Sequence, residues 1–114
     1  MRLVASCTGY DMTNSPVHKV FAHPIVLTEH VFDKVRSIDM TLAEFNELLT
    51  ANGVIIEETV MADAHVKELI LYLAWARPLH VVVHVDQVRQ EERIVTVYEP
   101  DAVRWTPDFT RRRS

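Results

Sequence analysis

Two valine-rich stretches near the end of the chain decide the fold: Arg77 to Val83 (RPLHVVV) and Val95 to Asp101 (VTVYEPD). Runs of β-branched and aromatic residues bounded by Pro or Asp are typical of β-strands. Each stretch carries one polar side chain that can exchange or donate a proton, His80 in the first and Tyr98 in the second. If the two strands share a sheet face, an imidazole and a phenol lie together there. This pair is the first candidate site.

Two further strands are predicted beside them. Leu69 to Trp75 is long enough for a helix, but Arg77-Pro78 follows it at once. Because the residue before a proline disfavours helix, a tight hairpin with Leu79 to Val85 is the more economical interpretation. Gln87 to Glu92 predicts a polar loop that leads into the strand Arg93 to Tyr98.

The segment before these strands is a mixture of extended and turn signals. Val54 to Ile56 predicts a short strand, and the acidic stretch Glu57 to His65 predicts a turn. Val17 to Leu27 predicts an edge strand that is interrupted at Pro24, since proline cannot donate to a sheet ladder. Met1 to Pro16 lacks periodicity and predicts a loosely held arm.

Two helices are predicted between residues 28 and 53. Thr28 can cap a helix that begins at Glu29, and its apolar stripe repeats at i, i+4 and i+7. Thr41 to Glu44 reads as a capping box for the second helix, and Gly53 is placed where a helix stop belongs. The predicted buried residues of the two helices are Val31, Val35 and Ile38, then Leu42, Phe45, Leu48 and Leu49.

These elements predict a single α+β domain over residues 17–114, with residues 1–16 as an arm. Two N-terminal helices would pack on one face of an antiparallel sheet of three to five strands. The length of 114 residues suits one modest core, and a hydrophobic content of 48% with 25% charged residues argues against wholesale disorder.

Composition also restricts the compartment and the partners. The chain has no run of 18 apolar residues and no leader pattern, which predicts a cytoplasmic protein. Its single cysteine, Cys7, excludes an internal disulfide. The net charge of −4 argues against a protein that coats nucleic acid. The last segment is nevertheless locally basic, because Asp101 to Ser114 holds four arginines against two aspartates.

The segment from Thr28 to Tyr98 resembles a bacterial domain family of uncharacterised function that is grouped with the RelE and MqsR toxin ribonucleases. The resemblance implies a compact fold of the RelE and barnase-like kind. It also implies cleavage of RNA by a toxin that a cognate antitoxin holds inactive. The matching features are His30 at the start of the first helix, Lys34 one turn later, the Thr41 to Glu44 capping box, Arg77 to Val83, Thr96 to Asp101, and Trp105.

RNA cleavage by 2′-hydroxyl attack requires a base, an acid and cations near the phosphate. His80 can serve as base or acid, because an imidazole pKa of about 6.5 leaves both forms populated near neutrality. Tyr98 can donate a proton or a hydrogen bond, and His30 can face the same cleft. Each has a structural alternative: His80 as a buried strand histidine, Tyr98 as a packing aromatic, and His30 as a surface residue.

Six further residues are candidates for substrate binding. Arg77 and Lys34 are possible phosphate clamps, and Arg104, Arg111 and Arg112 can contact an RNA backbone or an acidic partner. Trp105 can stack on a base or anchor the C-terminal segment, and Arg77 can instead be a charge at a hairpin tip.

No metal or cofactor is predicted. His80 and His84 lie on one strand face, but four residues of strand separate them by ~13 Å. With only two glycines, the chain has no phosphate-binding loop. Besides the ribonuclease, two alternatives stay open: a catalytically silent binding protein of the same fold, and a small-ligand pocket between sheet and helices. An exposed edge strand also permits a homodimer.

Overall fold

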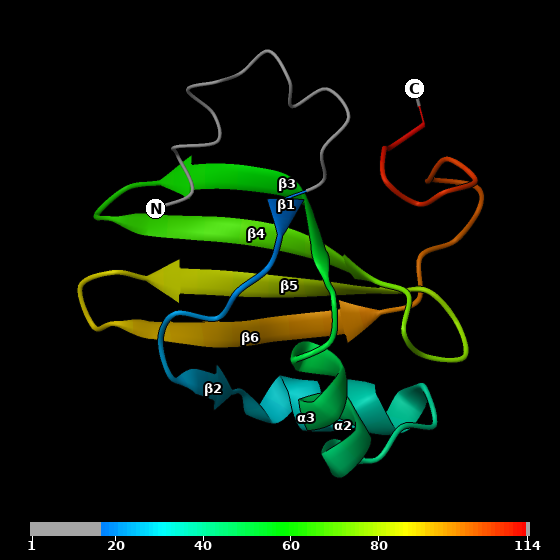
Figure 1. Cartoon of the computed structure of the whole chain (residues 1–114), viewed down its shortest axis with the longest axis horizontal. Coiled ribbons are helices and arrows are strands. Elements are labelled where there is room, and N and C mark those ends of the chain that lie inside the picture. The colour runs from blue at the N-terminus through cyan, green and yellow to red at the C-terminus, as the bar shows by residue number, and fades with distance from the viewer. Residues whose placement is uncertain (1–16, 114) are drawn as a thin grey trace.

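A meander of four antiparallel strands forms the centre of the computed structural model, which describes residues 17–113 (Figure 1). The predicted arm, residues 1–16, and Cys7 within it lie outside the described residues. The elements in chain order are β1 (Val17–His18), β2 (Ile25–Leu27), α2 (Glu29–Ser37), α3 (Leu42–Leu49), β3 (Val54–Met61), β4 (His65–Tyr72), β5 (Leu79–Asp86) and β6 (Glu91–Tyr98).

The two short strands β1 and β2 extend this meander at its opposite edges. The described sheet has six strands in the order β1-β3-β4-β5-β6-β2. β1 pairs antiparallel with β3, whereas β2 pairs parallel with β6 through Ile25↔Glu92 to Leu27↔Ile94. The chain between them, residues 19–24, therefore crosses the sheet from one edge to the other (Figure 1).

The predicted fold class was wrong in its arrangement. We expected two N-terminal helices on an antiparallel sheet of three to five strands, like that of RelE and barnase. Both helices instead follow the first two strands, and the described sheet is six-stranded and mixed. The physical reason is that Val17 to Leu27, predicted as one interrupted edge strand, forms two short strands at opposite edges of the sheet, and their partners lie far along the chain.

The prediction of a turn over Glu57 to His65 was also wrong for most of its length. β3 continues to Met61, and the reversal takes place at Asp63 and Ala64, with φ angles of 59° and 60°. Positive φ at both central residues is the geometry of a type I′ turn, whose twist matches that of the flanking strands. The acidic side chains of β3 therefore lie on a strand.

The helix boundaries follow local chemistry. The Thr41 hydroxyl accepts from the Glu44 main-chain N–H, and the Glu44 carboxylate accepts from the Thr41 N–H at 2.8 Å, which confirms the capping box. The second helix ends at Leu49, before Gly53. Gly53 has another role: a Cβ atom there would lie 2.7 Å from the Tyr72 ring.

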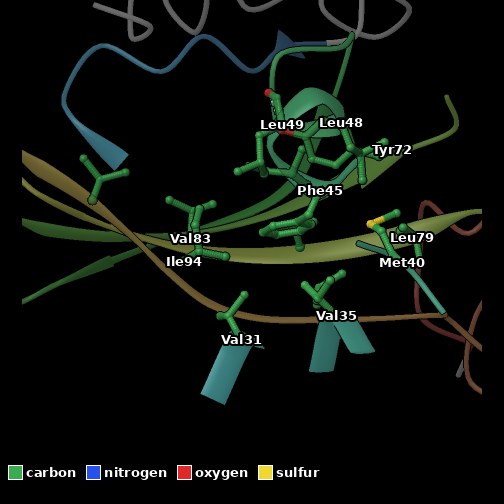
Figure 2. Close-up of a cluster of buried hydrophobic side chains, with 14 residues drawn as sticks. Val31, Val35, Met40, Phe45, Leu48, Leu49, Tyr72, Leu79, Val83 and Ile94 are labelled. Atoms are coloured by element: carbon green, nitrogen blue, oxygen red, sulfur yellow. Dashed lines mark hydrogen bonds between the residues drawn. The ribbon is translucent and has the colours of Figure 1, made fainter. Parts of the chain in front are cut away.

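The main core lies between the helices and one face of the sheet. Figure 2 shows Val31 and Val35 of α2 and Leu48 of α3 converging on Phe45. Phe45 is fully buried, and replacing it with alanine would cost about 3–5 kcal/mol of unfolding free energy. Neither described helix is long and apolar enough to span a membrane.

The opposite face of the sheet carries a second, smaller cluster. Leu69, Val82 and Trp105 are buried there, with Tyr98 and Phe109 packed beside them. Trp105 and Phe109 belong to the segment 101–113 that follows β6. This segment therefore covers one end of the sheet face that the helices leave free.

A buried ionic cluster holds the crossing segment against the helix-side face. The ammonium group of Lys19 bonds to the carboxylate of Glu92 and lies 2.8 Å from that of Glu68. The other Glu92 oxygen accepts from the main-chain N–H groups of Ala22 and His23, at 2.9 and 3.2 Å. All three charged side chains are at most 4% exposed, so the cluster ties β1, β4 and β6 together.

Candidate functional site

His80 and Tyr98 meet across neighbouring strands, as the sequence pattern predicts. They are directly opposite in the pairing of β5 with β6. The His80 Nδ1 atom lies 3.2 Å from the Tyr98 hydroxyl oxygen, and the two rings pack edge to face with centroids 5.3 Å apart. An imidazole and a phenol are therefore in hydrogen-bond contact on the face opposite the helices.

The same histidine is closed off by the C-terminal segment. The His80 residue is fully buried, and its Nε2 atom lies 2.9 Å from the main-chain oxygen of Phe109. The Trp105 ring packs edge to face against the imidazole, with ring centroids 4.3 Å apart. Because a carbonyl only accepts, Nε2 carries the proton and donates to Phe109. In the neutral ring Nδ1 then accepts from the Tyr98 hydroxyl. Both nitrogens are used within the chain.

The surroundings keep both groups uncharged. Burial lowers the pKa of His80, and the Phe109 carbonyl opposes this shift in part. Burial raises the pKa of Tyr98, while the nearby Arg112 guanidinium acts in the opposite direction. A neutral imidazole that accepts from a protonated phenol is the state that these shifts favour.

Arg112 clamps the covering segment to the sheet. Its guanidinium lies 4.7 Å from the centre of the Trp105 ring and donates to both carboxylate oxygens of Glu57 on β3, at 2.8 and 3.1 Å. The bond to Glu57 raises the pKa of Arg112 further. Trp105 is 3% exposed between Arg112 and His80, so it anchors the segment and has no open face for a base.

The remaining predicted residues lie elsewhere. The exposed His30 approaches the Thr96 hydroxyl at 3.4 Å. Lys34, on the same helix, is half-buried. Arg77 donates to the main-chain oxygen of Ile38 at 3.0 Å and pairs with Glu99 at 3.2 Å. Arg77 thus stabilises the end of α2. These contacts within the chain explain the position of its side chain without a bound substrate.

The C-terminal arginines present charge outward. The side chain of Arg104 is 82% exposed and lies 4.0 Å from Asp101. A hollow of about 440 Å³ is lined by Thr106 and by Arg111, Arg112 and Arg113. Arg113 is positioned by bonds from its Nε atom to the main-chain oxygens of Ala102 and Trp105, both at 2.8 Å. The segment is a braced, cationic turn.

Two clusters were missed from the sequence. One is Lys19 with Glu68 and Glu92, whose members are separated by up to 73 residues. The other is formed by His65 and His84, whose ring centroids are 4.9 Å apart. Alternation along β5 predicted that His84 shares a face with His80, but it gave no neighbour for His84. Its partner on β4 required the strand register.

In the part of the chain that the structure describes, no group of three or more His, Cys, Asp or Glu side chains is arranged to hold a metal ion. The chain matches no known protein family, and no curated protein or solved structure is significantly similar to it. The resemblance to the family grouped with RelE and MqsR toxins therefore stays a prediction.

Proposed function

We propose that this chain is a binding protein without catalytic activity at His80, and that its C-terminal arginines contact an acidic segment of another protein. The observation that carries the proposal is the closed state of His80. A general base must come within about 3 Å of the proton that it removes, and both nitrogens of this ring are already bonded to Tyr98 and Phe109.

Charge and geometry favour an acidic protein segment over RNA. The net charge of −4 opposes the long-range attraction of any polyanion, so an anionic partner must be held by local contacts. Trp105 packs against His80 and Arg112 and is 3% exposed, whereas single-stranded RNA is held by bases stacked on open aromatic rings. A short acidic segment needs only a few guanidinium groups, each of which can grip a carboxylate with two parallel bonds. The exposed Arg104 and Arg111 offer such groups.

The test is fluorescence anisotropy with a labelled peptide of alternating Glu and Ser residues. We expect saturable binding that weakens with salt and falls at least about tenfold in the double variant Arg104→Glu/Arg111→Glu, a loss of ~1.4 kcal/mol. Arg36→Glu on α2, whose side chain is 74% exposed, is the matched control and should bind normally. No binding by wild type, or equal binding by all three proteins, would refute the proposal. Tighter binding of a single-stranded RNA than of the peptide would also refute it.

A second candidate is the metal-independent ribonuclease toxin, held by an antitoxin, with His80, Tyr98 and His30 in proton transfer. The specific observation in its favour is that His80 and Tyr98 lie in hydrogen-bond contact beneath the covering segment, whose own Arg112 lies near Tyr98. If this segment moved away, the imidazole of His80 and the phenol of Tyr98 would face solvent together as an acid–base pair.

The toxin candidate is tested by cleavage of a defined mRNA in EDTA, with and without ribosomes. Wild-type cleavage that is lost in folded His80→Ala and Tyr98→Phe proteins would establish a ribonuclease on these strands. It would also replace the binding proposal. If wild type leaves the RNA intact in both conditions, the toxin candidate is rejected and the binding protein stands.

A further inference from the structure

At the far end of the sheet from the covering segment, a second hollow opens between the two hairpin turns. It measures about 440 Å³ and is lined from the β3–β4 turn, from β4 and β5, and from the turn into β6. The reversals at both ends of this hollow are visible on the side of Figure 1 away from the C-terminus. The lining residues are Asp63, His65, His84, Asp86, Val88, Arg89 and Arg93.

Strand register gathers basic side chains beside this hollow. Lys67, His84 and Arg93 are direct cross-strand neighbours on β4, β5 and β6. Opposed residues of antiparallel strands point to the same face, with Cβ atoms about 5 Å apart. His84 alternates with the core residues Val83 and Val85, so this row lies on the face opposite the helices.

Asp86 organises the hollow from within. One of its carboxylate oxygens accepts from the main-chain N–H groups of Val88 and Arg89, at 3.0 and 2.9 Å, and the other lies 3.3 Å from the His65 Nε2 atom. The Arg89 N–H is the largest cause of the lowered pKa of Asp86. Asp86 thus fixes the turn and contacts the His65 ring, and its second oxygen also lies 4.0 Å from the Arg89 Nε atom. Arg93 donates to Glu91 at 2.5 Å. Because each guanidinium has five N–H groups, donors of both arginines remain for a ligand.

His84 has hydrogen-bonding capacity left over. Its Nε2 atom is covered by neighbouring atoms and has no hydrogen-bond partner among the described residues. A covered polar atom without a partner is costly, so such atoms are rare in folded proteins. The His65 ring, which packs against His84, belongs to a side chain that is 31% exposed, and its 3.3 Å contact with Asp86 must break for the ring to turn aside. An incoming acceptor could then bond to the His84 ring.

We propose that this hollow binds the phosphate group of a small phosphorylated molecule, with His84, Arg89 and Arg93 as the donors. Guanidinium groups present a planar fork that matches phosphate oxygens, and an imidazole can add a third donor. The volume falls within the range of small-molecule sites, roughly 300–1,000 Å³. It exceeds what a phosphate alone would fill, so the ligand carries a further group that contacts Val88 and the turn.

The probes are inorganic phosphate and a nucleoside monophosphate, each titrated by NMR and calorimetry at constant ionic strength. We expect both to bind saturably and to shift the His84 ring proton signals, with the monophosphate bound more tightly. His84→Gln and Arg93→Gln should each weaken binding of the monophosphate at least about fivefold. His30→Gln and Arg36→Gln, which replace the same residue types on α2, should leave the affinity unchanged.

Several results would overturn the proposal: no saturable binding of either probe by wild type, equal affinity in the hollow variants and the α2 controls, or ligand shifts confined to residues outside the hollow. If His84→Gln fails to fold, Arg89→Gln replaces it, because the Arg89 side chain is 70% exposed and its loss should not disturb the core. Binding that is unaffected in folded Arg89→Gln and Arg93→Gln would likewise refute the site.

Discussion

His80 donates from its Nε2 atom to the main-chain oxygen of Phe109 across 2.9 Å, although the two residues are 29 positions apart. This bond joins the middle of the sheet to the last turn of the described chain. It requires a proton on Nε2, and the contact with Tyr98 suits a neutral ring. The closure of the sheet face is therefore coupled to the protonation state of one histidine.

Acid should weaken the fold through His80. Burial holds its folded-state pKa below 6.5, the value expected in the unfolded chain. The unfolded state therefore binds more protons as the pH falls below 6.5, and the unfolding free energy decreases by at most about 1.4 kcal/mol per pH unit. Urea denaturation at several pH values between about 7.5 and 5, followed by tryptophan fluorescence, measures this slope.

The control for this effect is His80→Gln, which keeps a donor and an acceptor but cannot titrate. Its overall stability should be lower, and its pH slope should be smaller than that of wild type by the contribution of one proton. Identical slopes in the two proteins would show that another histidine carries the acid sensitivity.

Replacing Lys19 should be among the most damaging single changes. Lys19→Met removes the ammonium group that pairs with the buried carboxylates of Glu68 and Glu92, and breaking a buried ion pair in this way typically costs about 3–5 kcal/mol. The midpoint of chemical denaturation should fall accordingly. Lys67→Met, at an exposed position on β4, should change the unfolding free energy by less than about 0.5 kcal/mol. A small effect at both sites would mean that the cluster does not hold the crossing segment.

The β3–β4 turn offers a stabilising change. Ala64 adopts a φ of 60°, a conformation that costs a residue with a Cβ atom about 1–2 kcal/mol relative to glycine. Ala64→Gly should therefore raise the unfolding free energy by up to about 1 kcal/mol, since glycine also gains freedom in the unfolded chain. Ala62→Gly, in the same turn, gains no such relief and should be neutral or destabilising. If Ala62→Gly stabilised the protein more than Ala64→Gly, the turn geometry described above would be wrong.

Gly53 should not tolerate a side chain. An added Cβ would lie 2.7 Å from the Tyr72 ring and 2.8 Å from the Ile70 Cγ2 atom. The Tyr72 ring cannot easily retreat, because it is fully buried and its hydroxyl donates to the main-chain oxygen of Leu49 at 3.1 Å. Gly53→Ala should cost about 1–3 kcal/mol through overpacking. Thermal unfolding of Gly53→Ala measures this loss of stability. Asn52→Ala, a change at an exposed neighbouring position, is the control.

Local signals predicted the local structure. The capping box at Thr41, the start of α2 after Thr28, and the two valine-rich strands depend on residues close in sequence, and each is where its pattern placed it. The pairing of β2 with β6 could not be predicted, because it joins three-residue segments almost 70 positions apart. Parallel pairing also leaves no turn signature between its strands.

In the candidate site, too, local features were predicted and long-range contacts were not. Alternation along β5 and β6 predicted that His80 and Tyr98 would share a face. It could not show that Phe109 and Trp105 would fold back over them, since that contact depends on the path of the last turn. The histidine pair His65 and His84 depends on strand register, and the burial of Lys19 depends on where the crossing segment passes.

The placement of β1 and β2 on opposite edges of the sheet has a consequence for biosynthesis. Both strands leave the ribosome early, yet β1 must wait for β3, and β2 must wait for β6, whose last residue is Tyr98. The Glu92 that anchors the crossing segment is also made late. β1 therefore has to remain without its sheet partner until Met61 has been made, and β2 until Tyr98 has been made. During that time their nascent edges are exposed to aggregation and to capture by chaperones.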